Sequence, residues 1–537
     1  MKTNCIVLLW AILALVGCES SDNHAAQPSK DPVAHETSSH SGTIHWFEGT
    51  IEEGFALAKA ENKPVFLYWG AVWCPPCQEI KHTVFKSPQF ISQTKLFVPI
   101  YLDGDTNRAQ AWGETFSVKG YPTMIVFNPD GDEITRIPGG IDISRYNTVL
   151  ALSLNNMRPT SMLVELALTQ PAKLQASDFV QLAYYSWGQD SDSLPEGTAA
   201  TFFRDLSELS DEPDASARLY MQYLTTLSEE LSTQKSENES VEPTEGHSTE
   251  AFARLMSYLD STMLTLACWD YFAYYAKDII GLPVFSEAEL GPLKEKWQAK
   301  MLALRSQPSL SSTEQLTAWL PLLAFHFLED EDATLPESVI ADLRADIMKA
   351  DSETSNAYAR QSVVSQMEEL LQSAKLYDDA RELLLAELEK SASPYYFMSG
   401  LAYLEEEQGN LTEALAWRRK AYKNSTGEAT RFQWGASYVR AIIRITPEDH
   451  KLVMASSMKL FDELQGDHTP FAGRNFRILR SVSTQLGTWQ SDQGDEDLTV
   501  PFHSRIAALC TRQVDPSIEL TNCLSLTIAH QSQPAVQ

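Results

Sequence analysis

Short apolar runs alternate with amphipathic stretches between residues 50 and 154, and this alternation predicts an α/β domain. Each run is bounded by Pro, Gly or Asn, as expected for strands buried in a sheet. Thr50 and Glu53 have the spacing of a capping box, which predicts the start of a helix. The predicted helices are 50–61, 106–116 and 144–154, and the predicted strands are 64–70, 96–102, 123–127 and 134–137.

From about residue 160 the pattern changes to helical periodicity rich in Ala, Leu, Glu and Gln, and we expect no strand there. Alanines recur 34 residues apart, and Gly409 suits a turn between two helices. This pattern resembles degenerate tetratricopeptide repeats and implies a helical-repeat region around 365–465. An irregular helical domain with chance alanine spacing is the alternative. The alanine pairs are Ala380 with Ala414, Ala402 with Ala436, and Ala421 with Ala455.

Cys74 and Cys77 follow the apolar run 64–70 directly, with Pro75 and Pro76 between them. Two cysteines on the first turn of a helix can close a disulfide of allowed geometry. The first thiol also lies where free backbone N–H groups and the helix dipole favour an anion, which lowers a thiol pKa. We therefore expect Cys74 to be the nucleophile and Cys77 the resolving thiol of a catalytic pair.

The same spacing also forms half of many zinc sites. The chain has 7 Cys, and no second CxxC or Cys/His pair at ligand spacing lies near this one. Beside a βαβ pattern the motif therefore favours redox chemistry, and we expect neither a metal nor an organic cofactor, because the dithiol itself carries the electrons.

A second signature, Gly-Tyr-Pro-Thr at 120–123, completes a resemblance to the thioredoxin superfamily over residues 43–155. The segment after Cys77, with Ser-Pro-Gln at 87–89, resembles the C-terminal thioredoxin domain of DsbD-type thiol:disulfide interchange proteins. The Pro-Pro dipeptide is shared with TlpA-like periplasmic thioredoxins. The resemblance implies a thioredoxin fold, and we expect the all-helical region 156–537 to follow it as a second domain.

The resemblance also implies roles for residues around the dithiol. Pro122 would be a cis-proline facing the cysteine pair, and Tyr121, Thr123 and Trp73 would line the groove for a substrate peptide. An X-Pro bond is cis in only about one case in twenty, so the bare sequence would not justify this assignment. An ordinary strand-edge proline is the alternative.

Two positions depart from the family pattern and predict a different redox tuning. Thioredoxins commonly carry an acid six residues before the nucleophilic cysteine, and this chain has Tyr68 there. The interchange domain carries a further acid where this chain has Lys81. We expect the loss of these carboxylates to lower the pKa of Cys74 and to give a less strongly reducing couple.

The first residues predict an exported protein. A short positive segment precedes an apolar run, and Leu-Val-Gly-Cys at 15–18 resembles a bacterial lipobox. Residues 1–17 would be a signal peptide, Cys18 the lipidated residue and 18–42 a flexible tether. Glu19 in place of Asp favours the outer membrane over the inner, with the protein facing the periplasm. An uncleaved anchor is the alternative, although the apolar run is short for a membrane span.

Three cysteines lie far from the motif. Cys510 and Cys523 are candidates for a structural disulfide, which an oxidising compartment would favour. Cys268, in an apolar stretch, is expected to be a buried small hydrophobe.

The net charge of −30 repels nucleic acid and anionic membrane surfaces and would favour basic partners. Residues 43–155 carry a net charge of −3 and residues 1–42 a net charge of −2, so −25 belongs to 156–537. The Ser/Glu/Thr-rich run 228–250 predicts a flexible acidic loop.

Together these observations predict a lipid-anchored periplasmic thiol-disulfide oxidoreductase. Its partners would be protein thiols or disulfides and a redox donor or acceptor, with the helical region offering a surface for docking. The alternative is an envelope scaffold lipoprotein in which the helical repeats bind partners and the thioredoxin fold is secondary.

Overall fold

The computed structural model describes residues 43–139, 143–155, 158–236, 248–464, 471–495, 497–511 and 518–528. The described residues belong to one compact unit. The expected signal peptide 1–17, the lipidated Cys18 and the tether 18–42 lie outside the described residues.

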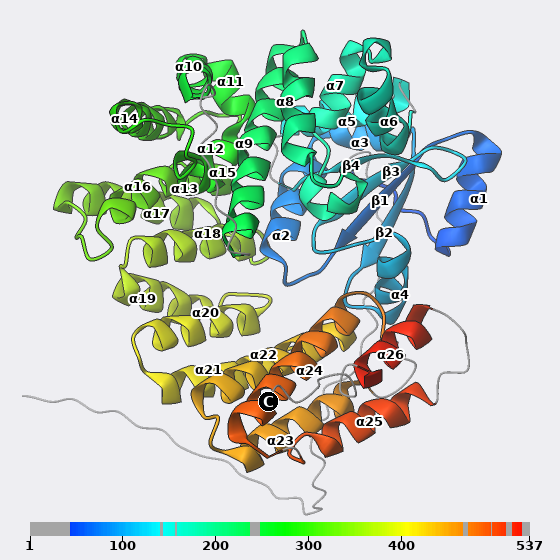
Figure 1. Ribbon diagram of the computed structural model, residues 1–537, viewed down its shortest axis with the longest axis vertical. Helices are drawn as coiled ribbons and strands as arrows, with labels where there is room; N and C mark the ends of the chain where they lie inside the picture. The colour runs from blue at the N-terminus through cyan, green and yellow to red at the C-terminus, as the bar shows by residue number, and fades with distance from the viewer. Residues whose placement is uncertain are drawn as a thin grey trace, which may run out of the picture. The chain divides into compact units, whose positions relative to one another are not determined.

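A four-stranded sheet with the order β2-β1-β3-β4 forms the first part of this unit (Figure 1). β1 runs parallel to β2 and antiparallel to β3, which pairs antiparallel with β4. The predicted thioredoxin fold is therefore confirmed, with crossover and hairpin in the expected order. The strands are β1 (Val65–Gly70), β2 (Val98–Asp103), β3 (Thr123–Phe127) and β4 (Glu133–Ile137).

Helices cover both faces of the sheet. On one face Leu67 and Ile125 share a core with Ile51 of α1 and Ala109 of α4. On the other face Phe66 packs with residues of α2, α3 and α5. The capping box at Thr50 is present and starts α1 where the sequence predicted it. These helices are α1 (Ile51–Glu61), α2 (Pro75–His82), α3 (Pro88–Thr94), α4 (Asn107–Thr115) and α5 (Ile143–Asn155).

The rest of the described chain is helical and contains no strand, as expected. Its first helices are α6 (Thr160–Thr169), α7 (Ala176–Ala183), α8 (Ala199–Leu209), α9 (Pro213–Ser236), α10 (Ser248–Asp260), α11 (Thr262–Ala267), α12 (Trp269–Tyr274), α13 (Ala276–Ile280), α14 (Glu287–Leu304), α15 (Ser312–Thr317) and α16 (Leu320–Glu329). The later ones are α17 (Glu337–Glu353), α18 (Ala359–Ser373), α19 (Tyr377–Glu387), α20 (Pro394–Glu407), α21 (Leu411–Asn424), α22 (Glu428–Ile445), α23 (His450–Lys459), α24 (Gly473–Gln493), α25 (Val500–Cys510) and α26 (Ile518–Ile528). Short 3-10 helices are η1 (Val84–Lys86), η2 (Pro171–Lys173), η3 (Trp187–Gln189), η4 (Ser191–Ser193) and η5 (Leu460–Leu464).

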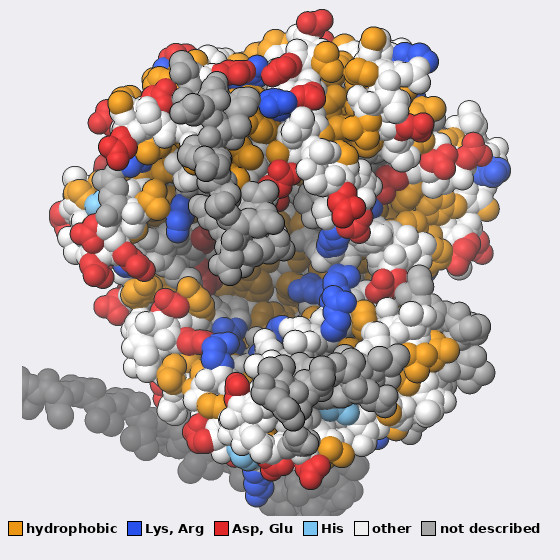
Figure 2. All heavy atoms as spheres, in the orientation of Figure 1, with side chains coloured by type: hydrophobic (Ala, Val, Ile, Leu, Met, Phe, Trp, Pro, Cys, Tyr) orange, Lys and Arg blue, Asp and Glu red, His pale blue; other side chains and the backbone are white. Residues whose placement is uncertain are grey.

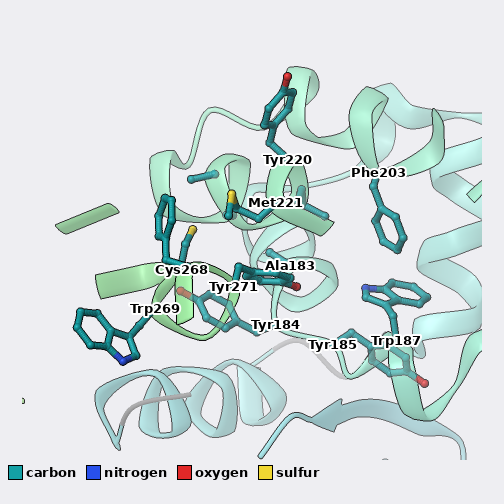
Figure 3. Close-up of a cluster of buried hydrophobic side chains, with 14 of the residues drawn as sticks. Ala183, Tyr184, Tyr185, Trp187, Phe203, Tyr220, Met221, Cys268, Trp269 and Tyr271 are labelled. Atoms are coloured by element: carbon teal, nitrogen blue, oxygen red, sulfur yellow. The ribbon is translucent and has the colours of Figure 1, made fainter. Parts of the chain in front are cut away.

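One hydrophobic core joins the sheet to the helices that follow it. Phe66 of β1, Tyr146 of α5 and Trp297 of α14 belong to the same cluster of buried side chains. Figure 3 shows its helical part, where Cys268 lies with Met221 among aromatic rings. Cys268 is a free, buried cysteine, as its apolar surroundings predicted. The packing is therefore continuous across the expected domain boundary at residue 155.

Helices α19 to α22 occupy the region in which the repeats were expected (Figure 1). α20 packs extensively on α21, and α21 packs on α22. Gly409 has a φ of 76° in the turn between α20 and α21, a conformation that glycine adopts without steric cost. Ala455 is exposed, so the third alanine pair does not share a buried position. The buried alanines of the pattern are Ala380, Ala402, Ala414, Ala421 and Ala436.

Both ends of the expected loop 228–250 are helical. Residues 228–236 continue helix α9 and 248–250 begin α10, so the prediction was wrong for those residues. Burial of the apolar side of α9 in the central core explains why the helix extends into a polar run. Residues 237–247 lie outside the described residues.

Within the described ranges, the helices lack the combination of length and apolar character that crossing a membrane requires.

Candidate active site

Cys74 caps the N-terminus of α2, four residues after the end of β1. Its sulfur accepts a hydrogen bond from the backbone N–H of Cys77 at 3.2 Å, and the two sulfurs form a disulfide. Pro75 and Pro76 occupy the first turn, where a missing N–H costs nothing because that group has no helical partner. The local sequence thus places Cys74 where backbone donors stabilise a thiolate.

The loop before β3 carries the second signature. The Tyr121–Pro122 peptide bond is cis. The single hydrogen of the Thr123 hydroxyl is shared between two acceptors, the carbonyl of Gly120 at 2.8 Å and Oε1 of Gln189 at 3.1 Å. Gln189, from η3, also donates from Nε2 to the Pro122 carbonyl at 2.9 Å. The helical region therefore contacts the loop that the resemblance assigns to substrate binding.

Trp73 joins the dithiol motif to the helical region. Its indole N–H lies 2.8 Å from the Thr430 hydroxyl and 3.2 Å from Oδ1 of Asp105, and both oxygens accept from it. Its carbonyl accepts from Nε2 of Gln361 at 3.1 Å. Its ring lies edge-on to Trp434, with centroids 6.3 Å apart. Thr430, Gln361 and Trp434 all come from helices more than 280 residues later in the chain.

The helical region also buries the two sulfurs. Cys74 is 2% exposed and Cys77 is fully buried, and both cluster with Tyr395 of α20 and Ala421 of α21. A globular protein disulfide cannot reach a thiol that is covered in this way without a rearrangement of the cover. Side chains of α20, α21 and α22 therefore pack against the dithiol motif.

A cavity of about 1110 Å³ opens beside the dithiol. The thioredoxin-like part contributes the two prolines of the motif, Tyr121 and Pro122 to its wall. The helical region contributes residues of α12, α15, α18, α20, α21 and α22, among them Glu368, Tyr396 and Trp434. Figure 2 shows a face of the protein that is hollowed near its centre, with apolar side chains inside the hollow.

Asp105 is a site residue that sequence reasoning missed. Burial raises its pKa to about 7, the N–H of Trp73 opposes this shift and Asp103 adds to it. The position of Asp105 could have been predicted from the sequence, because β1 and β2 are parallel and their carboxyl ends meet at one edge of the sheet. Asp105 follows β2 at the edge where Cys74 follows β1, so a carboxyl belongs beside the dithiol after all.

Of the two positions expected to tune the dithiol, Tyr68 lies on β1 and Lys81 lies on α2 itself. The hydroxyl of Tyr68 is 3.5 Å from the carbonyl of Cys77, and burial raises the Tyr68 pKa well above its ordinary value. The ammonium of Lys81 donates to the Tyr101 hydroxyl at 3.2 Å and lies 4.9 Å from the centre of that ring. Burial lowers the pKa of Lys81. Tyr68 thus touches the backbone of the motif, whereas Lys81 directs its charge at an aromatic ring.

Cys510 and Cys523 are bonded to each other and join α25 to α26. Among the described residues, no group of three or more His, Cys, Asp or Glu side chains is arranged to hold a metal ion.

The fold and the site together define a thioredoxin-like domain with a redox-active dithiol, and residues 51–153 match the family described as a thioredoxin-like domain. The chain is 28% identical over 148 residues to the thiol:disulfide interchange protein DsbD of Pseudomonas fluorescens, covering 26% of this chain and 25% of that protein. It is 34% identical over 99 residues to DsbD of Cronobacter sakazakii, covering 18% and 17% of the two chains. The chain thus spans about a quarter or less of the length of these relatives.

Among solved structures, a thioredoxin from Thermus thermophilus is 25% identical, with 21% of this chain and 88% of that chain covered and a TM-score of 0.20. The fold assignment rests on the family match and on the sheet order rather than on this likeness.

Proposed function

We propose that the protein is a thiol-disulfide oxidoreductase that acts on protein disulfides through Cys74 and Cys77. The observation that carries this proposal is the placement of Cys74 at the N-cap of α2, bonded to Cys77 and accepting its N–H. The similarity of residues 51–153 to thioredoxin-like domains and to DsbD supports it.

The reaction follows from this geometry. In the reduced protein the Cys74 thiolate attacks one sulfur of a substrate disulfide, and the other substrate sulfur leaves as a thiolate that takes up a proton. Cys77 loses its proton and attacks the Cys74 sulfur, which releases the second substrate thiolate and forms the Cys74–Cys77 disulfide. Two electrons pass from the protein to the substrate, and the reverse sequence makes the protein an oxidant. The proposal needs no cofactor, because the two sulfurs carry both electrons.

The location and the docking role are part of the same proposal. Lipidation of Cys18 would hold the protein at the periplasmic face of the outer membrane, with 18–42 as a tether. The helices around 365–465, which we propose to be related to tetratricopeptide repeats, would present partners to the dithiol. The contacts of Gln361, Thr430 and Trp434 with Trp73 support this role, because they connect helical surfaces directly to the motif.

The test is a trapping experiment. In the Cys77→Ala variant the mixed disulfide on Cys74 has no resolving thiol, so substrates should remain covalently attached and be identifiable after non-reducing electrophoresis. Cys74→Ser should abolish both trapping and disulfide reduction. Cys268→Ala is the matched control, because it removes a free buried cysteine remote from the motif and should leave trapping unchanged.

A scaffold function is the second candidate, and the burial of the dithiol favours it, because covered sulfurs react slowly. The scaffold role predicts that Cys74→Ser leaves partner binding and the cellular phenotype intact. Loss of disulfide exchange accompanied by an altered phenotype in Cys74→Ser would exclude it.

A further inference from the structure

Six arginines gather on three neighbouring helices beside the dithiol, and we call this group the arginine wall. α22 packs on both α21 and α24, so the three helices form one surface. Figure 2 shows Lys and Arg side chains at the edge of the hollow near the centre of that face. The arginine wall consists of Arg418 on α21, Arg440 and Arg444 on α22, and Arg474, Arg477 and Arg480 on α24.

The arginine wall reaches from the cavity to the dithiol motif. Arg418 lines the cavity and donates to the Ser399 hydroxyl at 2.6 Å. At the other end, the guanidinium of Arg474 lies 5.0 Å from the ring centre of Trp73 and 5.2 Å from that of Tyr121. An anion held along these helices would therefore lie next to the residue before Cys74 and the residue before the cis-proline.

Arg477 and Arg440 hold the middle of the arginine wall in place. Arg477 donates to the carbonyl of Val118 at 3.0 Å, and Arg440 donates to the Ser481 hydroxyl at 3.5 Å. These partners are neutral, so they orient the guanidinium groups without cancelling their charge.

The positive charge of the arginine wall is only partly compensated. Asp105 faces Arg474 and Glu114 faces Arg477, and both carboxyls favour the charged form of their arginine. Within the described part of the chain, Arg440, Arg474, Arg477 and Arg480 take part in no ion pair, and Glu406 alone serves both Arg418 and Arg444. Burial, followed by the charge of Arg444, lowers the pKa of Arg440. Half-buried like charges repel each other, and an anionic ligand relieves this repulsion. In a chain with a net charge of −30, such a concentration of arginine points to an acidic partner.

The opposite wall of the cavity does not neutralise these arginines. Burial raises the pKa of Glu368 to about 8, so this carboxyl is mostly uncharged at neutral pH. Glu369 beside it also has a raised pKa, and Gln366 and Gln372 complete a mainly polar, weakly charged surface. Three further carboxyls, Glu79, Asp270 and Glu314, line the part of the cavity toward α2, α12 and α15, and Arg418 is the member of the arginine wall that lines it. The positive charge therefore lies at one edge of the cavity, on α21, and continues along α22 and α24 outside it.

We infer that the arginine wall binds acidic side chains next to the reacting cysteine of an extended substrate polypeptide. This inference rests on the proposed disulfide exchange and names its substrate class. An extended segment fits because the dithiol is covered and the cavity of about 1110 Å³ lies just above the usual range of about 300–1,000 Å³ for small-ligand pockets. The arginine wall ends at Trp73 and Tyr121, next to the dithiol. A ligand that takes part in disulfide exchange there must carry a sulfur that reaches the dithiol, in addition to negatively charged groups that bind the arginines.

The experiment uses the reduced full-length protein and two synthetic peptides of equal length, each with one intrachain disulfide. Acidic residues flank the cysteines in one peptide and basic residues in the other. The rate constant for oxidation of the protein, followed by tryptophan fluorescence, should be about tenfold higher with the acidic peptide at low ionic strength. Added salt should reduce this preference. Uncharged hydroxyethyl disulfide serves as the reference oxidant.

Two variants test the arginine wall itself. Arg480→Glu changes an exposed side chain and should lower the preference for the acidic peptide at least about threefold. Lys451→Glu makes the same charge change on an exposed position of α23 and should leave the preference unchanged. Arg440→Gln, which keeps hydrogen-bonding capacity toward Ser481, should act like Arg480→Glu.

Equal rates with the two peptides, or equal effects of Arg480→Glu and Lys451→Glu, would overturn the inference while leaving disulfide exchange intact. Failure of hydroxyethyl disulfide and both peptides to oxidise the protein would overturn the proposed function and this inference with it. Polyphosphate can be added as a competing anion. If it slows oxidation of the Arg480→Glu variant by the acidic peptide as much as it slows oxidation of the wild type, the arginine wall is not the binding surface.

Discussion

Trp73 is the side chain that connects the chemistry of the motif to the rest of the molecule. Its N–H is shared between Asp105, at the end of β2, and Thr430, on α22. A hydrogen bond to a carboxylate is stronger than one to a neutral oxygen, so ionisation of Asp105 changes how firmly the indole is held. A buried carboxyl with a pKa near 7 beside a redox dithiol also places a titratable charge in the pH range where the thiol itself works.

We predict that Asp105→Asn lowers the pKa of the Cys74 thiol by about 0.5 to 1 unit, because it removes a negative charge that disfavours the thiolate. The measurement is the pH dependence of thiolate absorbance in the reduced Cys77→Ala background. Asp103→Asn, at a more exposed carboxyl of the same strand end, is the control and should have a smaller effect. An unchanged or raised pKa in Asp105→Asn would contradict this prediction.

At the level of elements, helices α20 to α22 act as a cover over the N-terminus of α2. Trp434 of α22 contacts Trp73 edge-on and also packs against Tyr395 and Tyr396 of α20. These contacts are aromatic rather than ionic, so the cover is held mainly by apolar surface. Removing one large ring from it should expose the dithiol more often.

We predict that Trp434→Ala increases the rate at which a bulky maleimide labels the reduced Cys74 by about threefold or more, since the ring that shields it is lost. The matched control is Trp417→Ala, which removes a half-buried tryptophan of α21 outside the dithiol cluster. Equal labelling rates in the two variants would show that α22 does not limit access.

A disulfide bond links the last two helices, α25 and α26, and we expect it to stabilise them. Cys510 of α25 and Cys523 of α26 are 13 positions apart, and both lie in the hydrophobic cluster of the last helices. A disulfide that closes a loop of about 15 residues stabilises the folded state by about 3 kcal/mol. We predict that the Cys510→Ala, Cys523→Ala double variant lowers the opening free energy of α25 and α26 by about this amount. Amide hydrogen exchange in these two helices is the measurement, and unchanged exchange would contradict it.

At the level of the whole molecule, a shared core holds the sheet and the helices together. The cluster that begins on β1 continues through α5 and α8 to α14 and α16. Helix α18 belongs to a neighbouring cluster and packs on both α2 and α16. A buried group on α18 therefore affects the stability of the helices on both sides of this contact. Glu368 is such a group, because its carboxyl is packed against Gly400 of α20, where a β-carbon would collide with Oε1.

We predict that the free energy of unfolding falls as the pH rises from about 5 to about 8. Burial raises the pKa of Glu368 to about 8, from an ordinary value of 4.5, so the folded protein holds a proton that the unfolded chain releases. The folded state therefore binds more protons over this interval, and stability is lost by up to about 5 kcal/mol as Glu368 ionises.

Glu368→Gln should reduce the slope of this pH dependence, because the amide cannot ionise. Asp105, whose pKa burial raises to about 7, acts in the same direction and should account for the slope that remains. Glu389→Gln, at an exposed position of the same region, should leave it unchanged. Urea unfolding followed by circular dichroism at several pH values is the measurement. A variant Glu368→Gln with the same slope as the wild type would contradict the assignment of the effect to Glu368.

The sequence by itself determined the features that depend on neighbouring residues. Strand and helix positions followed from periodicity, and the start of α1 followed from the capping box between Thr50 and Glu53. The placement of Cys74 at a helix N-terminus followed from an apolar strand and two prolines. These signals are local, because hydrogen bonds within a helix and the alternation along a strand span only a few positions.

Only the tertiary structure decided what surrounds the dithiol. Trp73 and Thr430 are 357 positions apart, and no sequence pattern in either segment predicts the hydrogen bond between them. The burial of Cys74 and the assembly of six arginines on three helices depend on the same long-range packing. Packing is set by shape and volume across the whole core, which no short stretch of sequence encodes.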